Sequence, residues 1–465
     1  MSVPENLLRQ PLVWRQPVLA PLLADLQANI LKGHGRPHAE LMLLRFDPAR
    51  RTSIRAALAA LELTSATHQL EDAERRRTDA KFDGGPVVLL FLTARGYDAL
   101  GVASARVPGG AAFTAGMAAR EALGDPSSQD WEDGYREGAD AMLLVADGSL
   151  KGTAAAAARA IEALTTAGAR IAARETGAAL FRDGAGIEHF GYVDGRSQPL
   201  MLDDEVVREL NQQGEPFVWD PRFGPLDVAL VSDPGGAGPN SYGSFLVFRK
   251  LEQDVAGFKS AEDGLADALD LMAPDARELA GALVVGRFED GTPVVASKRA
   301  LGAAHVANNF VYDGDPGGAR CPFQSHIRKT NPRGGTVPLG ATLADERSRL
   351  MPRRGITYGA RAPDLGDRPA KGVGLLFMAY NRDIERQFEF TQAAWANDDA
   401  FPCSGTGRDP VIGSGAAGHL WPKSWDHPEA GTLGSDFSSH VTLLGGEYFF
   451  APSLSFVGGL ALRPD

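Results

Sequence analysis

Short apolar runs along the chain predict buried strands, and the stretches between them predict helices. In the first part of the chain, apolar runs occupy 41–46, 87–92 and 141–146, broken only by Arg45. A run of about six residues favours a buried strand over a helix. The segments 53–63 and 154–167 are rich in Ala and Leu, which favour helices. The predicted order is therefore strand, helix, two strands and helix.

A second set of elements repeats this order in the later part of the chain. We expect strands at 244–248, 375–380, 441–444 and 448–450, and helices from about 254 to 280 and from 383 to about 395. Strand, helix, strands, helix and strand, twice over, predict an α+β fold of two ferredoxin-like halves with antiparallel sheets. No internal repeat is visible in the residues themselves.

Two loop-forming stretches separate the halves. Residues 220–225 and 233–241 are dominated by Gly, Pro and Asp, which do not occur together inside a helix or strand. We therefore predict an N-terminal domain over residues 1–225 and a C-terminal domain over residues 240–465.

Composition narrows the functional class. The chain has 465 residues, 44% of them hydrophobic, and a net charge of −12. That charge argues against non-specific nucleic-acid binding, and no apolar run approaches the ~20 residues that cross a bilayer. The first residues lack a basic leader followed by an apolar segment. Two cysteines, Cys321 and Cys403, indicate a reducing compartment without disulfides, so we expect a cytoplasmic protein.

One segment is strongly basic, although the chain as a whole is acidic. Residues 320–354 contain eight Lys or Arg against two acidic residues, with a single histidine, His326. Haem offers one axial position to a histidine and two propionates to arginines, so this segment suits haem better than a bare metal ion. Arg328 and Arg333 are the expected cofactor-binding cations. A solvated basic loop around a core histidine is the alternative from this segment alone.

Four blocks together give a more specific indication. They are Glu188-His-Phe-Gly-Tyr-Val-Asp-Gly-Arg-Ser-Gln-Pro199, the His326 segment, Met351-Pro-Arg-Arg-Gly-Ile-Thr-Tyr-Gly359 and the stretch from Gly374 to Phe390. In this order they closely resemble the dye-decolourising peroxidase family, from about Glu188 to the C-terminus. The His-Ile-Arg-Lys-Thr-Asn-Pro-Arg sequence is similar to that of the longer members.

The resemblance implies a haem b peroxidase. One noncovalent haem per chain would lie in the C-terminal half near the interface, with His326 as axial ligand and Asp194 and Arg353 on the distal side. Asp194 would carry a proton between the two peroxide oxygens, and Arg353 would stabilise the negative charge on the departing oxygen. The substrates would be hydrogen peroxide and dyes, phenols or other one-electron donors.

The resemblance assigns three further residues around the haem. Asp383 would hold the far ring nitrogen of His326, because axial histidines usually donate it to a carboxylate or carbonyl. Its alternative is an ordinary place at a helix N-terminus. Leu375 and Phe377 would line the distal pocket, with core packing as their alternative.

Bulky dyes would not fit such a pocket. We therefore expect electrons from large donors to enter through a surface aromatic residue. The candidates by position in the sequence are Tyr358, Tyr380, Trp395, Trp421 and Trp425.

Other functions of a haem site stay open. A haem-binding protein for iron release, storage or sensing would need His326 but no peroxide turnover. The sequence leaves the oligomeric state open, with a homo-oligomer among the alternatives, and it leaves the physiological reductant open.

Overall fold

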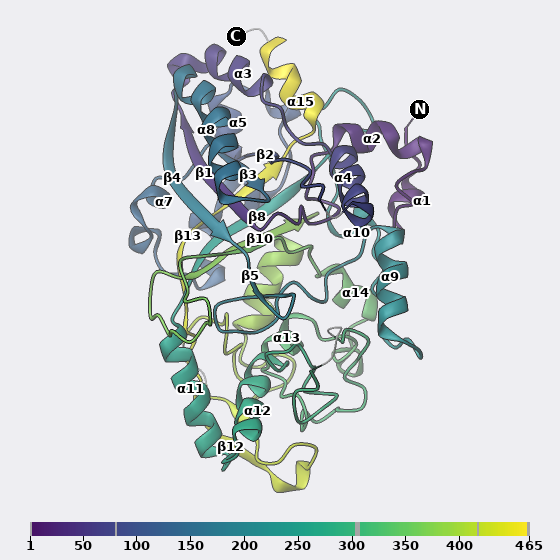
Figure 1. Cartoon of the computed structure of the whole chain (residues 1–465), viewed down its shortest axis with the longest axis vertical. Helices are drawn as coiled ribbons and strands as arrows, with labels where there is room; N and C mark the ends of the chain where they lie inside the picture. The colour runs from purple at the N-terminus through teal and green to yellow at the C-terminus, as the bar shows by residue number, and fades with distance from the viewer. Residues whose placement is uncertain (1, 80, 303–306, 416–417, 463–465) are drawn as a thin grey trace.

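The computed structural model describes residues 2–79, 81–302, 307–415 and 418–462. Figure 1 shows the strands of the large sheet in the upper half of the molecule, with helices α11, α12 and α13 and long loops below them.

The first ferredoxin-like unit contains the three predicted strands and two predicted helices, together with α4 and β4, which were not predicted. Its strands pair antiparallel in the order β4-β1-β3-β2, which is the ferredoxin-like order. The elements are β1 (His38–Phe46), α3 (Arg51–Ala59), α4 (Ala66–Thr78), β2 (Val87–Leu92), β3 (Ala141–Asp147), α8 (Leu150–Ala167) and β4 (Ala169–Ala178).

The second unit has the same strand order, β9-β10-β8-β13. Its elements are β8 (Tyr242–Gln253), α11 (Val255–Ala268), α12 (Pro274–Val285), β9 (Ile356–Tyr358), β10 (Gly374–Asn381), the π-helical segments Glu385–Glu389 and Thr391–Ala396, and β13 (Val441–Ala451).

Three details of the second unit differ from expectation. The predicted helix from 254 to 280 is two helices, because Pro274 begins α12 and cannot continue a helix. The two late strands are one strand, β13, with a register shift between Leu443 and Gly445. The three-residue strand β9 was not predicted, since so short a run carries no periodicity.

The two units share one closed sheet. β13 pairs with β2 at Phe450 and Leu92, and β4 pairs with β9 at Gly177 and Tyr358. Because β8 also pairs with β10, eight strands form a ring, and β7 (Val231–Ser232) extends from β8. The larger hydrophobic core takes residues from both units. The halves predicted from the sequence are therefore units of topology within one sheet.

The remaining elements surround this ring. A hairpin of β5 (Leu180–Arg182) and β6 (Ala185–Ile187) and helix α9 (Asp203–Gln213) lie in the connection between the units. The others are α1 (Glu5–Leu8), α2 (Ala20–Asp25), α5 (Ala94–Ala99), α6 (Ala111–Ala115), α7 (Asp133–Arg136), α10 (Pro225–Val228), α13 (His326–Thr330), α14 (Leu343–Ser348), β11 (Leu420–Pro422), β12 (Thr432–Gly434) and α15 (Leu454–Gly458).

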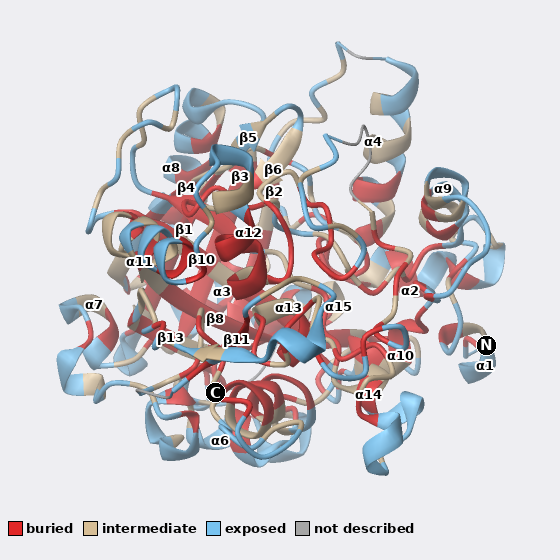
Figure 2. Cartoon of the chain, turned by 90° about the horizontal axis from the view of Figure 1, so that it is seen from below, coloured by how far each residue is buried: buried red, intermediate tan, exposed pale blue. Residues whose placement is uncertain are grey.

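A second, smaller core lies below the sheet. It contains Phe190, Phe258, Leu283, Trp421 and Phe437, all less than 4% exposed. Seen from below, buried residues gather around α12 at the centre, and exposed loops and helices surround them (Figure 2). Within the described residues, no helix has both the length and the apolar composition needed to cross a bilayer.

Candidate active site

A cavity of about 680 Å³ lies below the sheet, and both halves contribute to its wall. This volume is typical of a cofactor or substrate site. Much of the lining is apolar, and these side chains are Val285, Ile327, Leu375, Phe377, Phe388 and Val411. The polar groups that face the cavity include His326, Arg333, Asp194 and Arg353. The structure thus brings most of the predicted site residues together.

His326 begins α13 and is held by a carboxylate. Its Nδ1 lies 2.8 Å from Oδ2 of Asp409, whose side chain is 0% exposed. The other oxygen, Oδ1 of Asp409, accepts the backbone N–H groups of Val411 at 2.8 Å and Ile412 at 3.0 Å. With Nδ1 engaged, Nε2 is the ring nitrogen left for a ligand in the cavity.

Charge reinforces this pair. Burial disfavours the imidazolium, but the charge and hydrogen bond of Asp409 outweigh burial and raise the pKa of His326. Burial also acts against the Asp409 carboxylate, yet His326 and the two backbone N–H groups hold its pKa below the usual range. Asp409 is therefore ionised, and it increases the electron density on the imidazole.

The prediction for Asp383 is wrong. Oδ1 of Asp383 accepts the backbone N–H of Arg386 at 3.0 Å, so this carboxylate caps the helical segment that follows. The alternative considered from the sequence, a helix N-terminus, is the one observed. Asp409 was missed because it is 83 residues from His326 and no spacing rule connects them.

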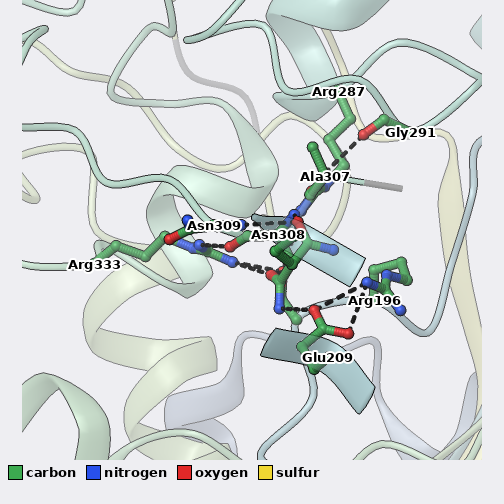
Figure 3. A network of polar contacts seen from close by, with 10 residues as sticks. Arg196, Glu209, Arg287, Gly291, Ala307, Asn308, Asn309 and Arg333 are labelled. Atoms are coloured by element: carbon green, nitrogen blue, oxygen red, sulfur yellow. Dashed lines mark hydrogen bonds and ion pairs between the residues drawn. The ribbon is translucent and has the colours of Figure 1, made fainter. Parts of the chain in front are cut away.

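Two buried arginines lie beside the cavity, and neither has a carboxylate partner among the residues that the structure describes. Arg333 is 2% exposed and donates to the carbonyls of Asn308 and Phe310, the side-chain oxygen of Asn308 and Oγ of Ser197. Arg287, 4% exposed, donates to the carbonyls of Gly291 and Ala307. Figure 3 shows both guanidinium groups around Asn308, while Glu209 pairs with Arg196.

Burial without an ion pair disfavours both guanidinium charges. It lowers the pKa of Arg333 to about 9 and that of Arg287 to about 10. An anionic group in the cavity would supply the missing countercharge. Arg333 was predicted to bind the cofactor, and Arg287 was not, because it stands alone at the end of α12 outside the basic segment.

Arg328 does not reach the cavity, which corrects its predicted role. Its side chain is 5% exposed and forms an ion pair with Asp315 at 2.8 Å. The guanidinium also lies over the rings of Tyr312 and Phe323, at 4.5 and 4.4 Å. In an α-helical turn, residues two apart point to different sides, so His326 and Arg328 do not face the same space.

Asp194 and Arg353 also line the cavity. Asp194 lies in the connection between the two units, and Arg353 lies just before β9. Asp194 is exposed, and its backbone N–H donates to Gly186. Nη2 of Arg353 donates to the carbonyl of Arg196 at 2.9 Å, and its backbone N–H donates to Gln198. Both charges act on His326, Arg353 lowering its pKa and Asp194 raising it.

The neighbouring Arg354 does not line this cavity. It donates to the carbonyls of Asn29, Ile30 and Arg353 and lines a second cavity of about 730 Å³. Asp194 and Arg353 line both cavities. They therefore stand at the boundary between the two cavities.

Of the five aromatic residues proposed for electron entry, four are buried. Tyr358, Tyr380, Trp395 and Trp421 are each 8% exposed or less. Trp425 is half-buried, donates its indole N–H to Val294 and lines a separate cavity of about 740 Å³. Only Trp425 among the five combines exposure with a cavity of its own.

Comparison with known proteins gives a consistent result. No family model matches the chain. The chain is 45% identical over 458 residues to the multifunctional dye peroxidase DyP2 of Amycolatopsis sp., covering 95% of this chain and 96% of the relative. It is 31% identical to Peroxidase 2 of Mycetinis scorodonius, covering 94% and 86%.

Solved structures agree. The structure of DyP2 matches with a TM-score of 0.90 and 43% identity, covering 97% of this chain and 99% of the other. A DyP-type peroxidase of Anabaena sp. matches with a TM-score of 0.89 and 40% identity, covering 95% of each chain.

Proposed function

The chain belongs to the dye-decolourising peroxidase family, and from this premise we propose that its main cavity binds one haem b noncovalently, with His326 as the axial ligand. The donor set fits such a group. It has one imidazole with a free Nε2, two buried guanidinium groups suited to propionates, and apolar walls suited to the porphyrin.

Arg333 and Arg287 would hold the propionates, and Asp409 would act behind His326. Its carboxylate fixes the ring through Nδ1 and makes Nε2 a stronger donor. Haem, when bound, supplies the iron at which the peroxide O–O bond is cleaved and the store of oxidising equivalents.

The distal residues would move the proton. The carboxylate of Asp194 accepts a proton from one peroxide oxygen and delivers it to the other, which leaves as water. The guanidinium of Arg353 stabilises the negative charge that develops on the leaving oxygen. Leu375 and Phe377, on one face of β10, limit the space beside these groups to small molecules.

Two kinds of reductant follow from this geometry. Small phenols would reach the cavity itself. Large dyes would give up their electrons at the surface, and Trp425 is the candidate residue. The names of the relatives, which describe dye peroxidases, support this substrate class.

The observation that carries the proposal is the His326–Asp409 pair facing Asp194 and Arg353 across one cavity. The test is the absorption spectrum of the purified protein with haem, followed by stopped-flow mixing with peroxide and steady-state dye oxidation. A Soret band with peroxide-dependent turnover supports the proposal. Haem binding without turnover favours storage or sensing, and iron release without turnover favours iron extraction.

A further inference from the structure

The loop that carries Asp194 is folded around one carboxylate, that of Glu188. Oε2 of Glu188 accepts the backbone N–H of Phe190 at 2.8 Å, and Oε1 accepts that of Tyr192 at 2.9 Å. Gln253 of β8 donates its side-chain N–H to Oε2. One carboxylate therefore fixes two backbone groups of the loop and ties the loop to the sheet.

The rest of the loop depends on the same turn. The backbone N–H of Glu188 donates to Tyr192, and that of Gly191 donates to Glu188. Gly191 has a φ of +100°, a conformation that strongly favours glycine. Asp194 follows Tyr192 by two residues and makes its own backbone bond to Gly186. The backbone that carries Asp194 thus continues directly from a turn that begins at Glu188 and is closed by its carboxylate.

We propose that Glu188 is a positioning residue for the peroxide step, because its carboxylate holds the backbone of residues 190–192 and thereby aims Asp194 into the cofactor cavity. The proposal rests on the proposed role of Asp194. Glu188 lines the cofactor cavity and also a cavity of about 460 Å³ on the other side of the loop.

Burial of the ionised Glu188 carboxylate destabilises the folded state. Removal from bulk water raises the pKa of Glu188 to about 7, although its three hydrogen bonds act in the opposite direction. A carboxyl group with a raised folded pKa destabilises the fold as pH rises from about 4.5 through 7, because the ionised form is favoured in the unfolded chain. A destabilising ionisable group beside a reaction cavity is typical of a functional residue.

Several charged groups surround Glu188, and they compensate one another. On its own loop Asp194 raises its pKa. His189 is the other titratable group of this loop, and the charged groups of neighbouring elements that line one of the two cavities include Arg182, Arg249, Lys259, Glu262, Glu289 and Arg361. Arg182 and Lys259 pair with Glu289, and Arg249 pairs with Asp125. Arg182 and Arg361 also hold the loop, by donating to the carbonyls of Gly191 at 3.1 Å and His189 at 2.7 Å. Glu188 is the group that binds the loop's backbone N–H groups, at Phe190 and Tyr192.

The test compares Glu188→Gln and Asp194→Asn, singly and together, in the haem-loaded protein. Gln keeps the size of the side chain but has one acceptor oxygen. We expect the second-order rate of the peroxide step to fall about 10- to 100-fold in Glu188→Gln, as for a misplaced catalytic group. The Soret band and the rate of donor oxidation should be unchanged. The double variant should be no slower than Asp194→Asn alone, because Glu188 acts through Asp194.

Glu447 provides a matched control. It is a half-buried carboxylate on β13 that also accepts two backbone N–H groups, from Met117 at 3.0 Å and Tyr448 at 2.8 Å, and its pKa is also raised by burial. It does not line the cofactor cavity. Glu447→Gln should leave the peroxide step unchanged.

A measurement on the haem-free protein separates the effect of Glu188 on the structure of the loop from its effect on the peroxide reaction. In the haem-free protein, amide hydrogen exchange at Phe190 and Tyr192 should be at least ten times faster in Glu188→Gln than in wild type. Glu188→Asp keeps the charge and should recover part of both the protection and the peroxide rate, and it serves also if the Gln variant does not fold.

The outcomes distinguish the two proposals. Unchanged amide exchange and an unchanged peroxide rate in Glu188→Gln would overturn the inference, and so would losses that multiply in the double variant. If Asp194→Asn leaves the peroxide step unchanged, the assignment of Asp194 fails, and the amide exchange still reports whether Glu188 holds the loop.

Discussion

The two ferredoxin-like units have the same strand order but very different connections. In the first unit, residues 47–86 and 148–168 connect β1 to β2 and β3 to β4, and α3, α4 and α8 make up most of these two links. Residues 93–140 connect β2 to β3. In the second unit, the corresponding links are residues 254–355 and 382–440. Apart from α11 and α12, the described residues of these two long links form short helices, short strands and irregular segments. They extend below the sheet (Figure 1).

The candidate site lies in the long links. His326, Arg333 and Arg353 come from the first of them and Asp409 from the second, while Asp194 comes from the segment between the units. The first unit provides sheet and core. The comparison teaches that a repeated scaffold leaves its connections free to differ. The polar candidate residues lie in the long links of the second unit and in the segment between the units, and among the described residues the first unit adds only residues 124–126 to the cavity wall.

The sharpest test of this division is loss of the axial ligand. His326→Ala should weaken haem binding by more than about 100-fold, beyond the usual effect of an outer partner, because the iron loses its one histidine. The Soret band reports binding, and far-ultraviolet circular dichroism should show an unchanged fold. His68→Ala, on exposed α4 of the first unit, is the control. A full Soret band in His326→Ala would refute the assignment.

The next test separates the two aspartates. Asp409→Asn should reduce haem affinity or turnover by about 10- to 100-fold, as is typical when the partner of a metal-bound histidine is changed. Asp383→Asn should have little effect on either, because Asp383 caps a helical segment. Haem titration and steady-state kinetics on both variants measure this. If haem affinity and turnover changed equally in the two variants, the His326–Asp409 hydrogen bond would have no specific effect on His326 as a ligand.

This pair shows what the sequence could and could not predict about the site. His326 and Arg353 stand within recognisable blocks, and the resemblance located both. Asp409, Arg287 and the true environment of Arg328 depend on how segments far apart in sequence pack together. Neither periodicity nor spacing contains that information, and Asp383 was chosen because it was close to a recognisable block.

A substitution in the core of the first unit should reduce the stability of the fold and leave the peroxide reaction unchanged. Leu143 of β3 is 0% exposed in the shared core. Leu143→Ala should lower the free energy of unfolding by about 2–5 kcal/mol, from lost burial and the cavity left behind. Denaturant unfolding measures the loss, while peroxide kinetics in buffer should stay unchanged. A large loss of the peroxide rate at full folding would show that the two units are not functionally separate.

Three of the four strands of this unit were easy to predict from the sequence, because they lie in the buried core. β1, β2 and β3 are largely buried on both faces, so each contains a mostly apolar run, broken only by Arg45 within 41–46 of β1. β4 was not predicted, because its burial alternates irregularly and charged residues interrupt it. β9 owes its existence to its neighbours, β4 and β10, rather than to its own sequence.

A pH effect should appear where the Asp194 loop meets β9. His189 is 2% exposed, and its Nε2 lies 2.7 Å from the carbonyl of Tyr358. Burial lowers the pKa of His189 to about 4. Because the folded pKa lies below the unfolded value of about 6.5, this contribution to stability is present above pH 6.5 and is lost as pH falls toward 4, by roughly 3 kcal/mol at most. Unfolding of the haem-free protein between pH 7 and 4 should be less pH-dependent in His189→Gln, and an identical slope would contradict the assignment.

The smallest expected effect concerns electron entry from large donors. Trp425 is half-buried and lines its own cavity, whereas Trp395 is 4% exposed and packs against Phe390 and Phe401. Trp425→Phe keeps an aromatic ring but removes the more easily oxidised indole. It should slow oxidation of a large dye a few-fold and leave a small phenol unaffected, because the phenol can enter the main cavity. Trp395→Phe is the control, since a buried ring offers no contact to a dye. Steady-state kinetics of both donors on both variants decide the matter. If the dye and the phenol respond alike to Trp425→Phe, large donors do not use this residue, and the chemistry of the second unit is confined to the cavity around His326.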